Sequence, residues 1–300
     1  MRLAKLIPKA IRRHHVAYRT RLWPLYRRFR ESVTVTTKQG VFTLPLTVDD
    51  PISRLLFTER QFELDFVSDA MSFIRTLNHL PKGKGTVLDV GANNGVISIG
   101  MLVTGELEKA VVIEPDPRNF SLLTHNVAQN KLEAVMTCLN CAVSDSKSTL
   151  QFELSEDNYG DHRVRRSVSD ATLEELHGES NRQVIDVESD TLDNLFAGLD
   201  EAFRNDIAVV WIDVQGHEGY AFLGGRSLLS SGVPVVAEIW PYGIHRSGMS
   251  QEAFCAIAGG IWSAYWVRRR GKFVKYPIEV LYTYFDELGY DGDYDNVIFT

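Results

Sequence analysis

Strand-like and helix-like segments alternate through the middle of the chain. Short apolar runs lie at 86–90, 110–113 and 134–143, and apolar residues at helical spacing follow the first two runs at 95–103 and 117–130. Units in this order favour a parallel sheet that is covered by helices on both faces. The pattern therefore predicts an α/β fold.

The second half of the chain continues this pattern with further strands. A helical segment around 220–229 separates two of them, and a polar, charged stretch at 155–183 interrupts the rhythm. We interpret this stretch, with its short helical pattern at 171–177, as an excursion from the sheet; long polar loops of this kind are either mobile or cover a site. The predicted strands of this half are 148–154, 207–213, 233–240, 261–267, 272–275 and 296–300.

Two elements precede the sheet. Alternating residues around a Lys38-Gln39-Gly40 turn predict a hairpin at 33–46, with Pro45 on an edge. An amphipathic helix is expected at about 61–80. We therefore divide the chain into a basic amphipathic leader (1–32), a hairpin and helix extension (33–84) and a domain that holds the sheet (85–300).

The first thirty residues are basic, whereas the rest of the chain is acidic. They contain ten Lys or Arg and no Asp or Glu, and the remaining residues hold 22 basic against 39 acidic side chains. Apolar residues at 3–11 and 23–29 form two amphipathic patches, with a helix start predicted at Pro24. Such a segment is typical of attachment to anionic lipid or to a partner, but also of a solvated tail or a helix packed on the body.

Composition narrows the class of protein. An acidic body lacks the broad basic face of a general nucleic-acid-binding protein, and no apolar run reaches the ~20 residues that span a bilayer. Three cysteines argue for a reducing compartment. Cys138 and Cys141 are expected on opposite faces of one strand, which disfavours a redox or zinc role, and Cys255 is expected to be buried. We expect a cytoplasmic protein, with peripheral contact at the inner membrane surface through residues 1–30 as an alternative.

A glycine loop is the strongest chemical signal. Asp89-x-Gly91-x-x-x-Gly95 lies where a strand turns into a helix, and its glycines allow a ligand to approach the backbone. A dinucleotide-binding loop would have glycine at the positions of Asn93 and Val96, so binding of a pyrophosphate is disfavoured. No Gly-Lys-Ser or Gly-Lys-Thr follows, so a phosphate-binding P-loop is absent as well.

An acidic residue accompanies this loop. Glu114 ends the next predicted strand, nineteen residues after Gly95, where its carboxylate can accept both hydroxyls of a ribose. Recognition of a ribose without a pyrophosphate suits S-adenosylmethionine. The sulfonium of this molecule is cationic, so Asp89 and an acidic pocket favour it electrostatically.

Candidate catalytic groups follow two later strands. Asp213 ends one strand with His217 one turn later, and Glu238 ends the next strand, before His245. Because the carboxyl ends of parallel strands share one edge of the sheet, we expect these four side chains to converge beside Gly91. A base would assist methyl transfer to a hydroxyl, and the near-neutral pKa of histidine suits His217 to that role. The four could also bind a divalent ion, but their spacing does not match a metal motif, so we predict no metal.

Together these motifs resemble the FkbM-type methyltransferases. The similarity extends from the hairpin to 296–299, and one departure is Gln215, where the family usually has Glu. The resemblance implies a Rossmann-like class I methyltransferase fold, with a mostly parallel, doubly wound sheet and an antiparallel last strand. It also implies O-methylation of a hydroxyl on a sugar, a glycan or a secondary metabolite. The matching segments are 89–98, 114–126, 140–145, 191–195 and 211–218.

The resemblance also implies roles for individual residues in binding S-adenosylmethionine. Glu114 would hold the ribose, Ser98 would close the helix start, and Glu63 would reach the methionine amine. Asn140 and Ala142 would frame the adenine. The residues that would line the methionine and ribose are Gly91, Ala92, Asn93 and Gly95.

Two other functions stay open at the level of the sequence. A cofactor-binding or scaffold protein without catalytic activity is favoured only by Gln215. A nicotinamide-dependent dehydrogenase would use a similar sheet but a different glycine loop. The sequence predicts neither which hydroxyl-bearing molecule is the acceptor nor the oligomeric state.

Overall fold

An eight-stranded sheet forms the centre of the molecule. The computed structural model describes residues 9–165 and 175–300, with side chains described from residue 14 on. Its strand order is β13-β12-β14-β11-β10-β3-β4-β5, and the last five strands in this order are parallel. These five are β3 (Thr86–Val90), β4 (Lys109–Ile113), β5 (Met136–Leu139), β10 (Ile207–Ile212) and β11 (Val235–Ile239).

The remaining three strands of this sheet are antiparallel to their neighbours. β14 pairs with β11 and β12, and β12 pairs with β13. The expected antiparallel last strand is therefore confirmed. These strands are β12 (Ala264–Arg269), β13 (Lys272–Pro277) and β14 (Asp295–Phe299).

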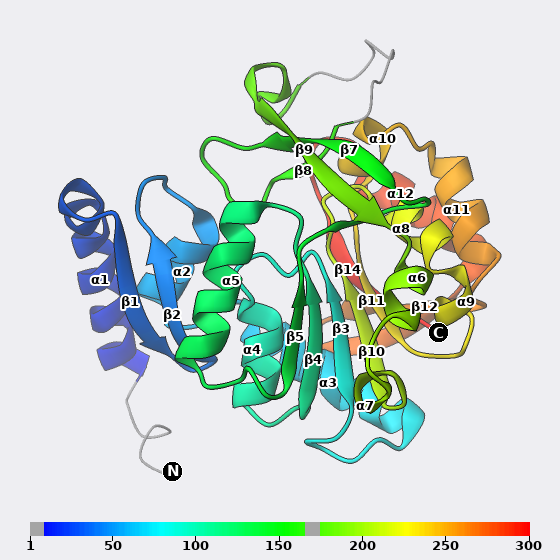
Figure 1. The fold of residues 1–300 in the computed structure, drawn as a ribbon, viewed down its shortest axis with the longest axis horizontal. Helices are drawn as coiled ribbons and strands as arrows, with labels where there is room; N and C mark the ends of the chain where they lie inside the picture. Colours follow the sequence, from blue (N-terminus) through cyan, green and yellow to red (C-terminus); the bar gives the residue numbers. More distant parts are fainter. Residues whose placement is uncertain (1–8, 166–174) are drawn as a thin grey trace.

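Helices cover both faces of the sheet (Figure 1). Alternate strand residues belong to two different hydrophobic clusters: Leu88 and Val210 pack on one face, Val87 and Val209 on the other. The doubly wound α/β fold is thus confirmed. One face is covered by α3 (Leu64–Asn78), α4 (Val96–Val103) and α5 (Pro117–Gln129). The other face is covered by α6 (Leu192–Ala197), α8 (Glu218–Gly224), α9 (Arg226–Leu229), α11 (Gln251–Gly259) and α12 (Leu281–Leu288).

A second, four-stranded sheet lies beyond the carboxyl ends of the parallel strands (Figure 1). The single strand predicted at 134–143 is wrong: the chain leaves the central sheet at Asn140, whose side-chain amide donates to the carbonyl oxygens of Glu114 (2.8 Å) and Pro115 (3.2 Å). β7 also belongs to this sheet. The four strands, in sheet order, are β6 (Ala142–Val143), β9 (Gln183–Asp190), β7 (Ser148–Leu154) and β8 (Arg163–Val164).

The polar stretch at 155–183 is anchored by buried charges. Arg163 and Arg182 both pair with Asp161, and Arg163 also lies 3.6 Å from Glu179 and 4.8 Å from the ring of Trp240. This stretch therefore supplies β8 and a short helix (Glu179–Asn181) that packs on the main domain. Of the helical pattern expected at 171–177, residues 171–174 lie outside those described and 175–177 are not helical.

The predicted hairpin is present as β1 (Ser32–Thr37) and β2 (Gly40–Pro45). Its outer edge meets α5, where Asn130 bonds both the N–H and the carbonyl of Val41, at 2.8 and 2.7 Å. Phe42 and Leu44 join the same hydrophobic cluster as α3. The hairpin is thus part of the main core rather than an appendage.

The leader contains one long helix, α1 (Lys9–Phe29). It continues through Pro24, so the helix start predicted there is wrong; Pro24 is exposed, where water can satisfy the carbonyl that it leaves unpaired. The ring of Trp23 packs on Phe57 of α2 (Pro51–Thr58), at 5.3 Å between centroids. The first expected patch, 3–11, lies largely outside the described residues. Among the described helices, none has the length and apolar character to cross a bilayer.

Three further helices complete the described chain. They follow α6, β11 and β13: α7 (Glu201–Arg204), α10 (Pro241–Arg246) and a short 3₁₀ turn (Ile278–Val280).

We expect Arg163→Met to lower the free energy of unfolding by about 3–5 kcal/mol, because it removes a cation from the buried carboxylates of Asp161 and Glu179. Urea denaturation followed by circular dichroism measures the change. Lys84→Met, which removes only the exposed pair with Glu108, is the control and should change stability little. Equal effects of the two substitutions would contradict a stabilising role for the buried cluster.

Candidate active site

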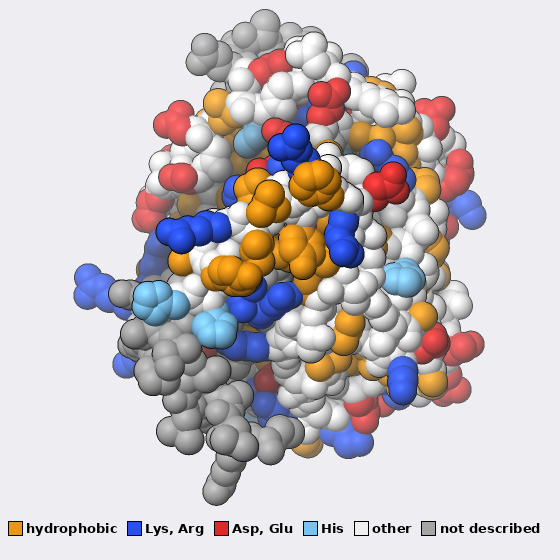
Figure 2. All heavy atoms as spheres, turned by 90° about the vertical axis from the view of Figure 1, so that its left-hand side faces the viewer, with side chains coloured by type: hydrophobic (Ala, Val, Ile, Leu, Met, Phe, Trp, Pro, Cys, Tyr) orange, Lys and Arg blue, Asp and Glu red, His pale blue; other side chains and the backbone are white. Residues whose placement is uncertain are grey.

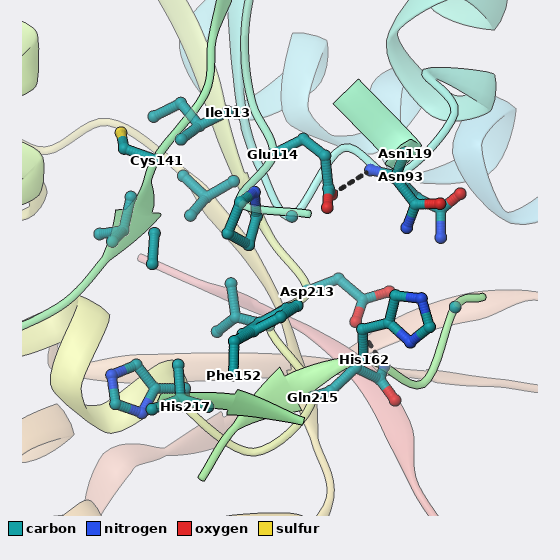
Figure 3. Close-up of a pocket in the computed structure, with 18 of the residues that line it drawn as sticks. Asn93, Ile113, Glu114, Asn119, Cys141, Phe152, His162, Asp213, Gln215 and His217 are labelled. Carbon is teal, nitrogen blue, oxygen red and sulfur yellow. Dashed lines mark hydrogen bonds between the residues drawn. The ribbon is translucent and has the colours of Figure 1, made fainter. Parts of the chain in front are cut away.

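Two adjoining cavities lie at the carboxyl ends of the parallel strands. The first has a volume of about 630 Å³ and is drawn in Figure 3. The second has a volume of about 1380 Å³. Both are lined by Ile52, Gly160, Asp213 and Gln215, so these four residues form the wall where the cavities meet.

The glycine loop forms one side of the first cavity. Gly91 has a φ of +90°, and a β-carbon there would lie 1.8 Å from the carbonyl oxygen of Asp213. Glycine is therefore required because the end of β10 passes directly against the loop. Asn93 also lines the cavity, and its side chain donates to the carbonyl of Tyr159 at 2.9 Å.

Glu114 lies opposite this loop with its carboxylate held by the backbone. One oxygen accepts from the N–H of Asn93 at 2.8 Å (Figure 3). The other accepts from the N–H of Asp116 at 2.9 Å. Burial raises the pKa of Glu114 to about 8. A ligand whose hydroxyl groups donate hydrogen bonds to this carboxylate would favour its charged form and lower its pKa again.

The far end of the first cavity is mainly apolar. Cys141, Ala142 and Phe152 line it, and Figure 3 shows His217 on this side, away from Glu114. Such a slot suits a flat heterocycle better than a charged group. Of the two residues expected at the adenine, Ala142 lines the cavity, whereas Asn140 bonds the backbone behind it.

Four residues expected at the cofactor do not line the first cavity. Asp89 and Ser98 are buried and bond each other at 2.5 Å, which ties β3 to α4, and burial raises the pKa of Asp89 to about 7. Gly95 has a φ of +84° and packs under Leu123. Like these three, Ala92 is not among the residues that line the cavity. Their contact with a cofactor stays a prediction.

A cluster of acidic side chains lies at the junction. Carboxylate oxygens of Asp213, Glu218 and Glu238 lie within 4.8 Å of one another. The side-chain amide of Gln215 donates to Asp213 at 2.7 Å and to Glu238 at 3.2 Å. Burial raises the pKa of all three acids, to about 8 for Glu218, and the neighbouring carboxylates raise the pKa of Glu238 further.

Glu63 lies on the wall of the second cavity. Burial, together with the nearby charge of Asp213, raises its pKa to about 7. Glu63 precedes α3 with a φ of 47°, and the helix expected at 61–80 starts three residues later than expected, at Leu64. This left-handed backbone places the carboxylate at the cavity rather than on a helix face.

Of the two histidines expected beside Gly91, His217 lines the first cavity with Gly91 and Asp213, whereas His245 does not. Gln215 and Gly216 both have positive φ, 54° and 96°, and His217 follows this tight turn on the apolar side of the cavity (Figure 3). His217 bonds Ser144 at 3.0 Å and stacks on Tyr220. His245 packs near Tyr290 and lines neither cavity.

The three carboxylates at the junction could offer oxygen ligands to a divalent ion. Gln215, however, already places a hydrogen-bond donor between two of them. The amide thus supplies part of the positive partial charge that a cation would supply. The absence of a metal from the mechanism stays a prediction.

Several residues that line the first cavity were not predicted from the sequence. Tyr159, Gly160 and His162 come from the polar stretch, and Ile52 comes from α2, which no pattern predicted. The Nε2 of His162 lies 3.2 Å from a carboxylate oxygen of Asp116. The only signal for the first three was the general tendency of long loops to cover sites.

The fold defines the class of protein as a Rossmann-like α/β protein with cavities at the carboxyl ends of its parallel strands. A model of the methyltransferase FkbM domain matches residues 89–252, which is more than half of the chain. The chain therefore belongs to the FkbM methyltransferase family, and its methyl donor is S-adenosylmethionine. This confirms the family that the sequence resembled.

Solved structures give distant similarities. The methyltransferase FkbM from Methylobacillus flagellatus is 13% identical with a TM-score of 0.43; the match covers 84% of this chain but only 56% of that one. TYW2 from Pyrococcus horikoshii, solved in complex with MeSAdo, is 12% identical with a TM-score of 0.42. This match covers 99% of this chain and 94% of that one. A comparison with curated proteins finds no match.

Gly91→Ala should lower the free energy of unfolding by at least about 2 kcal/mol, because its β-carbon would overlap the carbonyl of Asp213. Gly105→Ala is the control: Gly105 also has a positive φ, +71°, but has open space at its β-carbon. That variant should lose only about 1 kcal/mol. Similar losses in both variants, measured by denaturant unfolding, would show that the close approach does not matter.

Proposed function

We propose that this methyltransferase transfers the methyl group to a hydroxyl group, on a sugar, a glycan or a secondary metabolite. The observation that carries the proposal is the pair of adjoining cavities with Asp213 and Gln215 in their common wall. One cavity is shaped for a nucleoside, and the other is left for an acceptor. Potential proton acceptors lie where the two meet.

The first cavity fits S-adenosylmethionine by the chemistry of its walls. Glu114 would accept the ribose hydroxyls, and Gly91 and Asn93 would line the ribose and methionine. The apolar slot beside Ala142 would take the adenine. Glu63 and Asp213, on the wall of the second cavity, provide negative charge for the methionine amine and the sulfonium.

S-adenosylmethionine supplies an electrophilic methyl group on a cationic sulfur. The chain's own contribution is to hold the acceptor in line and to take its proton. A carboxylate whose pKa is raised toward neutrality is a stronger base than an ordinary one, so we assign proton removal to Asp213 or Glu238. Gln215 holds these two carboxylates in position through its amide.

We also propose a cytoplasmic location. Cys138, Cys141 and Cys255 are free, as expected for a reducing compartment. Cys138 packs with one hydrophobic cluster and Cys141 with the other, which confirms that their side chains diverge. Cys255, expected to be buried, is only partly buried.

A transfer screen tests the proposed reaction. The protein is incubated with methyl-labelled S-adenosylmethionine and a panel of glycans, free sugars and small hydroxyl compounds, and label in the acceptor is measured. Binding of S-adenosylhomocysteine without transfer to any acceptor would favour a cofactor-binding scaffold. Calorimetry that detects NAD binding, but no S-adenosylhomocysteine binding, would favour a dehydrogenase and overturn the proposal.

Glu114→Ala is expected to weaken S-adenosylhomocysteine binding by about 1.5–3 kcal/mol, because it removes a charged acceptor for the ribose hydroxyls. Isothermal titration measures the affinity, and thermal unfolding checks that the variant remains folded. Glu133→Ala removes an exposed acid elsewhere on the surface and serves as the control. Unchanged affinity in Glu114→Ala would exclude contact with the cofactor.

Asp213→Asn or Glu238→Gln should lower kcat by about 10²–10⁴-fold, according to which carboxylate is the base. In the wild type, only the deprotonated base is active, and burial raises its pKa, so kcat should rise with pH above the ordinary carboxyl range. The variant that removes the base should lose this rise, whereas His217→Ala should retain it. Loss of the rise in His217→Ala alone would reassign the base to the histidine.

A further inference from the structure

The outer face of α1 exposes large apolar side chains. Tyr18, Leu25 and Phe29 are 64%, 53% and 74% exposed. Their spacing of seven and four residues places them on one side of the helix. In Figure 2 hydrophobic side chains gather in the middle of this face of the molecule. Exposed apolar residues in a group, rather than singly, mark an interaction surface.

Cationic side chains surround this group. Arg21 and Arg28 are exposed on the same side of the helix, and Arg28 lies over the ring of Phe29 at 5.5 Å. Figure 2 shows Lys and Arg around the hydrophobic side chains, with His next to them. We name this surface the docking face and define it by Tyr18, Arg21, Leu25, Arg28 and Phe29.

The opposite side of α1 is fixed to the body. Trp23 is buried and donates to Asp49 at 2.7 Å. Arg27 pairs with Asp49 at 3.3 Å, and Arg19 donates to the carbonyl of Thr58 at 2.5 Å. The helix therefore has a set orientation, and the docking face is directed outward.

We propose that the docking face binds the surface of a membrane that contains anionic lipids. The charges fit this occupant: residues 1–30 hold ten basic and no acidic residues, whereas acidic residues outnumber basic ones by 39 to 22 in the remainder. An anionic surface thus attracts this helix and repels much of the rest of the molecule, which sets the orientation of binding. Interleaved aromatic, leucine and arginine side chains on one helix face suit the depth of the headgroup region.

A protein partner fits the docking face less well. Stable protein interfaces use roughly 20–30 residues on each side, far more than the five of this face. The core of such an interface is also depleted of charge, whereas here two arginines lie among the apolar side chains. A membrane surface needs no shape complementarity and pairs its phosphates with arginine.

Docking would place the second cavity near the membrane. α2 lies directly beneath α1, where Phe57 contacts both Trp23 and Tyr26. From the same short helix, Ile52 and Leu55 line the second cavity. One helix therefore separates the docked helix from the cavity that we assign to the acceptor.

Vesicle cosedimentation of the full chain tests the proposal. We expect binding to phosphatidylcholine vesicles that contain 30% phosphatidylglycerol, little binding to pure phosphatidylcholine, and weaker binding at high salt. The apolar variant is Tyr18→Ser with Leu25→Ser and Phe29→Ser, and the charge variant is Arg21→Glu with Arg28→Glu. Each should reduce the partition coefficient by about tenfold or more.

Matched control variants replace the same types of side chain, apolar and basic, on other faces of the molecule. Leu223→Ser removes an exposed apolar side chain of α8, and Arg270→Glu with Lys272→Glu reverses two exposed charges at the turn between β12 and β13. Both controls should bind vesicles like the wild type. Circular dichroism confirms that every variant is folded.

Three results would overturn the proposal. The first is no binding of the wild type to anionic vesicles. The second is equal binding by the wild type and both docking-face variants. The third is a stable dimer of the wild type that dissociates in the apolar variant, which would identify the face as a protein interface. None of these readouts depends on methyl transfer, so they stand apart from the proposed reaction.

Discussion

The carbonyl oxygen of Asp213 passes so close to Gly91 that no side chain fits between them. This contact joins the ends of β3 and β10, the two central parallel strands that pair with each other. It brings the glycine loop, which faces Glu114, next to the turn that carries Asp213 and Gln215. The wall between the two cavities exists because these two strand ends meet without a side chain between them.

The acidic cluster shows a conflict between stability and chemistry. Asp213, Glu218 and Glu238 are buried close together, and burial and mutual repulsion raise their pKa values. Such groups cost stability when they are charged, because they have left water without a full cationic partner. Gln215 relieves part of this cost with one amide that bonds Asp213 and Glu238, the two acids that line the second cavity. Sites that move protons commonly keep acids in this state.

Two surface segments enclose the site. The second sheet and its buried ion pairs hold Tyr159, Gly160 and His162 over the first cavity. On another side, α2 closes the second cavity and is itself covered by α1. The leader is therefore a structural layer of the protein and not only a charged tail.

Much of the central sheet could be predicted from the sequence, because buried parallel strands are short apolar runs and the helices between them have a 3.6-residue period. The positions of the glycine loop and Glu114 could also be predicted from the sequence, because both lie at the ends of adjacent strands. Local pattern also located the hairpin and β7. It could not assign β7 to a separate sheet, because strand propensity carries no information on the pairing partner.

The arrangement of the catalytic side chains depended on tertiary structure. Strand ends correctly placed Asp213 and Glu238 together, but His217, after the positive φ of Gln215 and Gly216, bonds Ser144 instead of joining their cluster. Asp89 and Ser98 belong to the same motif, but they bond each other and neither lines the first cavity. The sequence by itself determined which strands end at the site and which residues follow them. Only the tertiary structure decided where those side chains point, because a turn of two or three residues can reverse the direction of a side chain without changing the hydrophobic pattern.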